Sequence, residues 1–135
     1  MNKNIGLLAI ALLSACAAQD ETPTQDTEQA VRDFIDVREL AEADTMRTSN
    51  RDGWQKIDQN FIIYETSKET YLLEFVRSCL ELDQYPVVPD ERRSGNLVRA
   101  RYDTVRGCRI AKLFPVTEGE VAELKAIGES PGSRN

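Results

Sequence analysis

The hydrophobic pattern divides this chain of 135 residues into an apolar start, a polar stretch and a longer patterned segment. Residues 5–18 are almost continuously apolar, but this run is too short to cross a hydrocarbon core about 30 Å thick as a helix. Residues 17–27 are rich in polar and acidic side chains and cannot bury enough apolar surface to become ordered. We therefore expect a flexible tether over residues 16–27, followed by a folded domain.

The first part of that domain, residues 28–42, fits either a helix or a strand. Apolar residues recur near helical spacing at Val31, Phe34 and Ile35, and Thr27 could cap such a helix. The segment Phe-Ile-Asp-Val-Arg also alternates between apolar and polar residues, which is typical of a strand. Both interpretations remain open at this point.

A short edge strand is predicted over residues 45–51, and the polar residues 50–53 predict a turn. Trp54 and Ile57 follow this turn, and we expect both in the core.

Two segments rich in β-branched and aromatic residues, 60–66 and 71–76, flank the polar residues 67–70. They predict a hairpin with a four-residue loop. One face would hold Ile62, Tyr64, Thr66, Tyr71, Leu73 and Phe75, and the other Phe61, Ile63, Leu72 and Val76. Apolar residues on both faces indicate a central pair of strands that is covered on both sides, with helices on one side.

Residues 97–104 and 108–114 predict a second hairpin, with Gly107 in a three-residue loop. This register gathers apolar side chains on one face and places Asp103 opposite Arg109 on the other. The apolar face would hold Val98, Ala100, Tyr102, Cys108, Ile110 and Phe114, with Lys112 as its only charge. A two-residue loop would mix charged and apolar residues on one face, so the three-residue loop is predicted.

Thr117 and Glu120 form the sequence pattern of a capping box, which predicts a C-terminal helix. Residues 78–85 predict a short helical turn. Together these elements predict one α+β domain over residues 28–128. It would consist of a small antiparallel sheet of two hairpins, with the option of closing into a barrel, and of a C-terminal helix. Residues 129–135 are expected to fray.

The residues Leu13-Ser14-Ala15-Cys16 follow the apolar run, and Lys3 precedes it. This arrangement is typical of a secretory signal over residues 1–15. The four residues resemble the lipobox of bacterial lipoproteins, which implies cleavage before Cys16 and acylation of this cysteine. Three acyl chains would hold the mature chain on a bilayer essentially permanently. An ordinary cleaved signal with an incidental cysteine is the other interpretation.

The residues after Cys16 bear on the compartment. The aspartate that often retains such lipoproteins at the inner membrane is absent there. We therefore expect the mature protein to be anchored in the periplasmic leaflet of the outer membrane. Anchoring in the inner membrane is the less favoured alternative.

Cys79 and Cys108 are the other two cysteines of the chain. In an oxidising compartment we expect them to form a disulfide that joins the two hairpins. A redox-active pair is the alternative, although the chain has no Cys-x-x-Cys motif.

Composition narrows the function further. Without the signal, the chain would hold 16 basic and 23 acidic residues, a net charge of −7 that argues against nucleic acid as a partner. The chain has no histidine, which removes the commonest general base and the commonest neutral metal ligand. No Asp-rich calcium loop is present. We predict no catalytic residue, no metal site and no cofactor.

Basic residues concentrate in residues 92–112, which contain seven of them and one acid, whereas residues 17–91 have a net charge of −11. The seven are Arg92, Arg93, Arg99, Arg101, Arg106, Arg109 and Lys112. They could pair with the acidic half of the protein itself, or bind an anionic lipid headgroup, glycan or protein. If the segment binds an anion, Arg99 and Arg101 would form the centre of the binding site, since Asp103 would neutralise Arg109. Arg92 and Arg93 would add to this site.

Several short motifs occur in a recognisable order. They are Trp54-x-x-Ile57-Asp58, Tyr71-Leu72-Leu73-Glu74-Phe75, Cys79-x-x-Leu82, Tyr102-Asp103-Thr104-Val105 and Gly107-Cys108-Arg109-Ile110. Over about residues 31–115, this order resembles a domain-of-unknown-function family of small secreted or lipid-anchored proteins of Gram-negative bacteria. The resemblance implies no activity. It implies that Cys79 and Cys108 are a matched pair and that Asp103 belongs to a structural turn.

The sequence therefore predicts a non-enzymatic envelope lipoprotein, an accessory or binding module held at the membrane by its lipid anchor. Two alternatives remain open. A carboxylate-dependent hydrolase of envelope glycans or peptides would need two acids in a cleft, and a carrier of an apolar ligand would need an unfilled cavity inside the sheet.

Overall fold

A computed structural model describes residues 23–84 and 95–129 of the chain. The elements in chain order are α1 (Pro23–Arg38), β1 (Thr45–Arg47), β2 (Gly53–Lys56), β3 (Phe61–Glu65), β4 (Thr70–Phe75), the 3₁₀ helix η1 (Leu80–Asp83), β5 (Leu97–Arg99), β6 (Thr104–Val105), β7 (Cys108–Val116) and α2 (Glu118–Gly128). The predicted α+β class is confirmed. The predictions for the signal, Cys16, Arg92, Arg93 and residues 130–135 lie outside the described residues.

Residues 28–42 prove to be mainly helical, and the helix begins earlier than predicted. α1 starts at Pro23, so the tether predicted through residue 27 is wrong for its last five residues. Thr27 does not cap the helix but is 3% exposed within it, one turn before the buried Val31 and Phe34. The buried stripe therefore extends one turn further toward the N-terminus, and proline is favoured at a first helical position.

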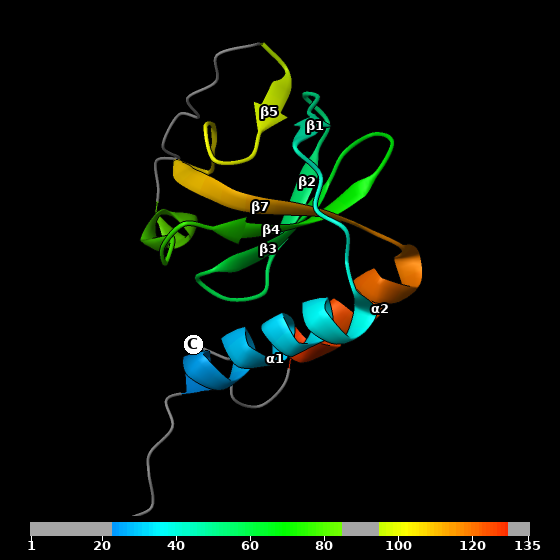
Figure 1. Ribbon diagram of the computed structural model, residues 1–135. Coiled ribbons are helices and arrows are strands. Elements are labelled where there is room, and N and C mark those ends of the chain that lie inside the picture. The colour runs from blue at the N-terminus through cyan, green and yellow to red at the C-terminus, as the bar shows by residue number, and fades with distance from the viewer. Residues whose placement is uncertain (1–22, 85–94, 130–135) are drawn as a thin grey trace, which may run out of the picture.

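α1 and α2 lie side by side against one face of the main sheet (Figure 1). The buried residues between the helices and the sheet are Val31, Phe34, Ile57, Phe61, Ile63, Leu72, Phe114 and Leu124. The predicted capping box is present at the start of α2, where the side chains of Thr117 and Glu120 each accept a hydrogen bond from the other's backbone N–H. Within the described ranges, no helix has the length and apolarity needed to cross a membrane.

The main sheet is antiparallel, with the strand order β2-β3-β4-β7-β6. The first predicted hairpin is β3–β4, and its two faces are apolar as expected. The loop consists of residues 66–69 instead of 67–70, because Glu65 pairs with Thr70. Both strand ends move by one residue, so the paired side chains of β3 and β4 keep their predicted faces. The prediction that Val76 lies on the covered face is wrong, because Val76 follows the end of β4 and is 59% exposed.

β2 is an additional strand beside β3 that the sequence did not predict. Trp54 and Ile57 nevertheless both pack in the core, as expected, but on opposite sides of the sheet. β1 is the predicted short edge strand. It pairs with β5 in a separate two-stranded sheet, which we call the ribbon.

The register predicted for the second hairpin is wrong. Val105 pairs with Cys108, so the loop has two residues, Arg106 and Gly107, with φ values of 57° and 83°. Positive φ at both positions is the requirement of the type I′ turn that joins two-residue hairpins. The prediction failed because residues 97–104 are not one strand: a turn separates β5 from β6 and resets the alternation of side chains.

Two consequences follow from that turn and from an irregularity in β7. Tyr102, expected in the core, is 60% exposed at the turn. Phe114 packs under the helices instead of beside Cys108 and Ile110, because the β4–β7 register shifts between Glu74 and Phe75.

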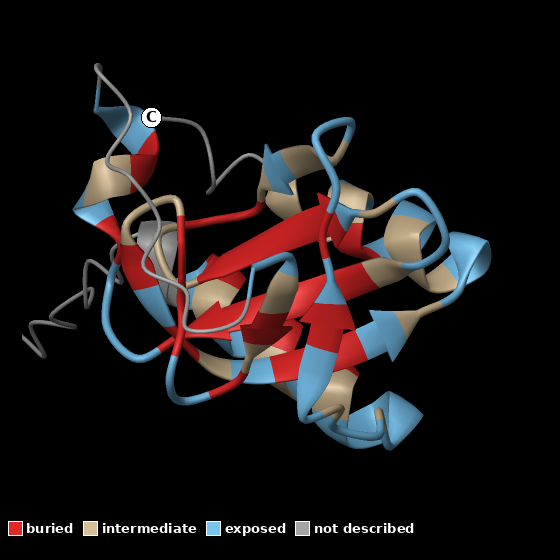
Figure 2. Ribbon diagram, turned by 90° about the horizontal axis from the view of Figure 1, so that it is seen from above, coloured by how far each residue is buried: buried red, intermediate tan, exposed pale blue. Residues whose placement is uncertain are grey.

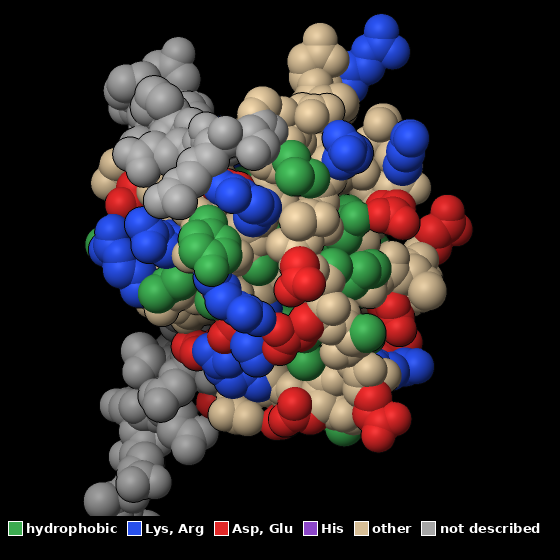
Figure 3. All heavy atoms as spheres, turned by 45° about the horizontal axis from the view of Figure 1, so that its top comes forward, with side chains coloured by type: hydrophobic (Ala, Val, Ile, Leu, Met, Phe, Trp, Pro, Cys, Tyr) green, Lys and Arg blue, Asp and Glu red, His purple; other side chains and the backbone are tan. Residues whose placement is uncertain are grey.

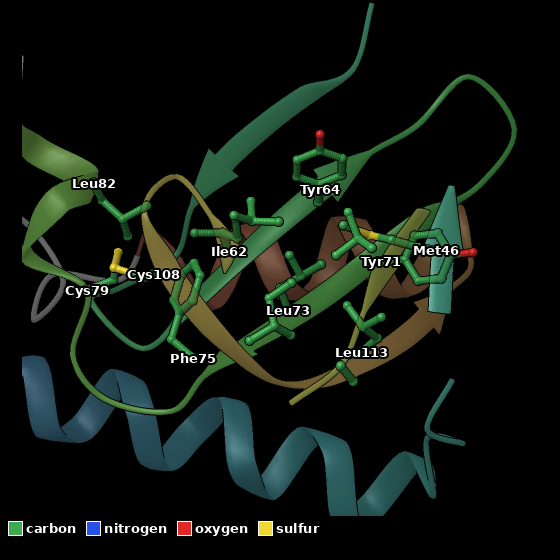
Figure 4. Packing of buried hydrophobic residues seen from close by; sticks show 14 residues of the cluster. Met46, Ile62, Tyr64, Tyr71, Leu73, Phe75, Cys79, Leu82, Cys108 and Leu113 are labelled. Carbon is green, nitrogen blue, oxygen red and sulfur yellow. A yellow bond between two sulfur atoms is a disulfide. The ribbon is translucent and has the colours of Figure 1, made fainter. Parts of the chain in front are cut away.

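The sheet curls around a second core on the face opposite the helices (Figure 4). Fourteen buried residues fill this interior, and the ribbon covers it with Met46 and Val98. Figure 2 shows buried residues concentrated in the strands and exposed residues in the connecting loops. The guanidinium of Arg106 lies 4.4 Å from the ring centroid of Trp54, which brings the two edges of the sheet together as a half-barrel.

Candidate functional site

Cys79 and Cys108 form the predicted disulfide, with their Cα atoms 5.8 Å apart. The bond joins the segment after β4 to the first residue of β7, and both sulfurs are buried beside Leu82 (Figure 4). A carboxylate oxygen of Glu81 lies 3.0 Å from Cys108 Sγ. These three residues have metal-ligand atoms within 4.8 Å of one another, but both sulfurs are bonded to each other in this state.

Residues 99–103 form an exposed turn that we call the basic turn. Asp103 is 1% exposed, and its carboxylate accepts hydrogen bonds from the backbone N–H of Arg99 at 2.8 Å and from its Nε at 3.2 Å. The bond to Asp103 raises the pKa of Arg99, so this guanidinium stays charged. Asp103 thus belongs to a structural turn, as the family resemblance implied. It does not lie opposite Arg109, whose partner in the sheet is Thr104.

Arg101 and Tyr102 stand at the apex of the basic turn. Arg101 has a φ of 70°, a conformation that few residues other than glycine adopt, and its side chain is 66% exposed. It forms an ion pair with Glu42 at 3.6 Å, and Glu42 also pairs with Lys112 at 3.0 Å. The guanidinium of Arg99 lies 5.6 Å from the Tyr102 ring centroid. The basic segment therefore pairs in part with the protein's own acids, but one carboxylate is shared by two cations.

The ribbon connects the basic turn to a second basic residue. Met46 and Val98 face the core, so the paired residues on either side of them face outward. Arg47 lies opposite Leu97 and therefore diagonally across from Arg99, at a typical separation of about 7–8 Å in such pairs. Arg47 could not be predicted as part of this site, because only the pairing of segments about fifty positions apart brings it beside Arg99. Figure 3 shows lysine and arginine side chains in several groups on this side of the molecule.

A groove of about 710 Å³ opens between the ribbon and the β3–β4 loop. It is lined by Thr45, Met46, Arg47, Thr48, Ser49, Thr66, Ser67, Lys68, Glu69, Tyr71, Asn96 and Leu97. Met46 and Tyr71 lie at the same end of the half-barrel and form the floor (Figure 4). Burial, together with the hydrogen bond that Tyr71 donates to Glu69, raises the pKa of Tyr71 to about 12, so the phenol stays neutral.

A hydrolase would need a pair of acids in a cleft, and a carrier of an apolar ligand would need an unfilled cavity. Among the described residues that line the groove, Glu69 is the single acid, whereas glycoside hydrolysis uses a carboxylate pair. Asp58 is buried elsewhere, and burial raises its pKa, but it accepts the N–H groups of Asn60 and Phe61 and thereby supports a turn beneath α1. The interior of the half-barrel, where an apolar ligand would lie, is occupied by side chains.

A family model described as a family of unknown function, DUF6491, matches residues 1–128. The chain belongs to this family. The match confirms the expectation of a domain-of-unknown-function family and carries no activity with it. No curated protein and no solved structure matched. In this DUF6491 chain, the basic turn, the ribbon and the groove are the features that bear on function.

The disulfide of this DUF6491 chain closes a loop of 29 positions, which predicts its contribution to stability. Replacing both Cys79 and Cys108 with serine should lower the free energy of unfolding by about 3.5 kcal/mol, because the unfolded chain regains the entropy of the open loop. Urea denaturation followed by circular dichroism measures the change. Reductant should destabilise the wild-type protein similarly and leave the double variant unaffected. A loss below about 1 kcal/mol would contradict the structural role of this bond.

Proposed function

We propose that this DUF6491 chain is an envelope lipoprotein, a non-enzymatic module that binds an anionic partner through its basic turn. The lipobox-like residues 13–16 support the anchor. The observation that carries the binding role is the basic turn itself. Its exposed residues, Arg101 and Tyr102, stand on a turn that the buried carboxylate of Asp103 closes through the backbone N–H of Arg99. Arg92 and Arg93 precede β5 in the sequence and would add to its positive charge.

The anchor would hold the domain close to the membrane. Six residues separate Cys16 from Pro23, where α1 begins. Six residues would span ~13 Å (root mean square) if they behaved as a random coil, which is shorter than the span expected for a tether ending at residue 27. The periplasmic leaflet of the outer membrane is the compartment we propose, on the sequence argument given above.

The fold would then direct the basic turn away from that leaflet. α1, the element nearest the anchor, covers one face of the sheet, and the ribbon covers the other (Figure 1). An anionic glycan or protein in the periplasm is therefore better placed to reach the basic turn than a lipid headgroup of the anchoring leaflet. Arginine suits such a partner because its planar fork binds carboxylate or phosphate with two hydrogen bonds.

The lipid anchor can be tested at Cys16. Cys16→Ser should move the protein from the membrane fraction to the soluble fraction or leave its signal uncleaved, because the thiol is the proposed site of acylation. Mass spectrometry of the wild-type N-terminal peptide should show an acylated Cys16. An unmodified thiol at the mature N-terminus would contradict the anchor.

The binding role can be tested with defined polyanions on the full-length protein in nanodiscs. Polygalacturonate supplies carboxylates, polyphosphate supplies phosphates and dextran is the neutral control. Arg99→Gln combined with Arg101→Glu should weaken polyanion binding about tenfold or more, as expected for charge-assisted hydrogen bonds. Arg51→Glu is the matched control, because Arg51 is exposed and forms no ion pair within the described chain.

Biolayer interferometry at low and high salt would measure these affinities. The proposal predicts binding of at least one polyanion that falls with salt and with the double variant but not with Arg51→Glu. Equal binding by the double variant and the wild type, or no binding of either polyanion, would overturn it.

A further inference from the structure

The groove beside the ribbon has its own chemistry, which differs from that of the basic turn. We propose that it binds a carboxylated sugar unit of an acidic glycan, whose chain continues along the ribbon to the basic turn. This inference deepens the proposed function and rests on it for the contact between the glycan chain and the basic turn. The groove itself is lined by residues that do not belong to the basic turn.

Two cations of the groove have no acidic partner among the residues that the structure describes. Arg47 and Lys68 are exposed and form no ion pair with any residue of the described chain. Glu69, the acid that lines the same groove, accepts the hydrogen bond of Tyr71. The groove therefore has a net positive charge and two side chains able to hold a carboxylate.

The remaining polar groups suit a ligand with hydroxyls. The hydroxyls of Thr48, Ser49 and Thr66 already donate to groups of the protein. The side chains of Thr45, Ser67 and Asn96 have no hydrogen bond within the described residues and can donate to or accept from sugar hydroxyls. Met46 and Tyr71 supply an apolar floor for the C–H groups of a sugar ring.

The size and position of the groove agree with a small ligand. Its volume of about 710 Å³ lies within the range of ~300–1,000 Å³ that is usual for ligand pockets, and the mouth of a barrel is a common place for them. A single sugar with a carboxylate fits the two cations and the hydroxyl partners. A bare phosphate would use the cations but leave the other polar groups without a role.

The ribbon provides the continuation for a chain. Arg47 lines the groove, Arg99 lies diagonally across the ribbon from it, and Arg101 follows at the apex of the basic turn. Arg47 and Arg99 lie on the outward face of the ribbon, because Met46 and Val98 face inward. Repeated acidic units of one glycan could therefore contact the groove and the basic turn together.

The test compares two sugars that differ only at C6. Galacturonic acid carries a carboxylate there and galactose a hydroxymethyl group. Saturation-transfer NMR on the full-length protein in nanodiscs should show galacturonate binding at least tenfold tighter than galactose. Lys68→Glu should weaken galacturonate binding about tenfold or more, and Lys68→Met, which keeps most of the side chain, should also weaken it. Arg77→Glu, on the exposed segment after β4, is the charge-matched control and should change nothing.

The outcomes separate the groove from the basic turn. Arg101→Glu should leave galacturonic acid binding unchanged and weaken trigalacturonate. If Lys68 variants weaken both ligands but Arg101→Glu weakens neither, the groove stands and the role of the basic turn falls. If galacturonate binds no tighter than galactose, or inorganic phosphate displaces it completely at equal concentration, the saccharide site is overturned whatever the basic turn does.

Discussion

The half of this domain that could meet a partner depends on one buried carboxylate. Asp103 accepts the backbone N–H and the Nε of Arg99, four residues before it, and so closes the basic turn between β5 and β6. A buried charged group costs several kcal/mol unless it is fully hydrogen-bonded, so this turn has little freedom to open. The chain can therefore pass directly from β5, which pairs with β1 in the ribbon, to β6, which belongs to the main sheet.

The rest of the fold supplies a rigid base for the ribbon and the basic turn. β3, β4 and the second half of β7 are covered on one face by two helices and on the other by the half-barrel core. The disulfide holds the end of β4 against the start of β7, close to the point where the second hairpin begins. The ribbon, the basic turn and the groove are thus carried on strands whose side chains are buried on both sides. Sites on such elements keep their geometry better than sites on long loops.

Local patterns in the sequence predicted much of this base. The capping box of α2, the two apolar faces of β3–β4, the disulfide and the core positions of Trp54 and Ile57 all depend on short-range spacing or on residue type. The second hairpin could not be predicted in the same way. The predicted register assumes unbroken alternation over residues 97–104, and the turn closed by the hydrogen bond from the Arg99 N–H to the Asp103 carboxylate breaks that alternation.

The candidate site was predictable only in part, for the same reason. Arg99 and Arg101 stood out because they are close in the sequence to other basic residues. Arg47 and Lys68 did not, since they come from segments of the chain with a strong acidic excess. Only the pairing of β1 with β5, and the approach of the β3–β4 loop to the ribbon, bring them onto the same surface. A groove formed by three separate segments leaves no signal in any one of them.

Amide hydrogen exchange in the wild type and in Asp103→Asn tests most directly whether Asp103 organises this half of the domain. The Arg99 amide donates to Asp103, and the Ala100 amide donates to the carbonyl of Asp44 beside β1. Both amides should exchange roughly 10- to 100-fold faster in the variant, as expected for the loss of a hydrogen bond to a charged group. The amides of Leu72 and Leu73 should change far less. Equal exchange of Arg99 and Ala100 in the two proteins would contradict the central role of this carboxylate.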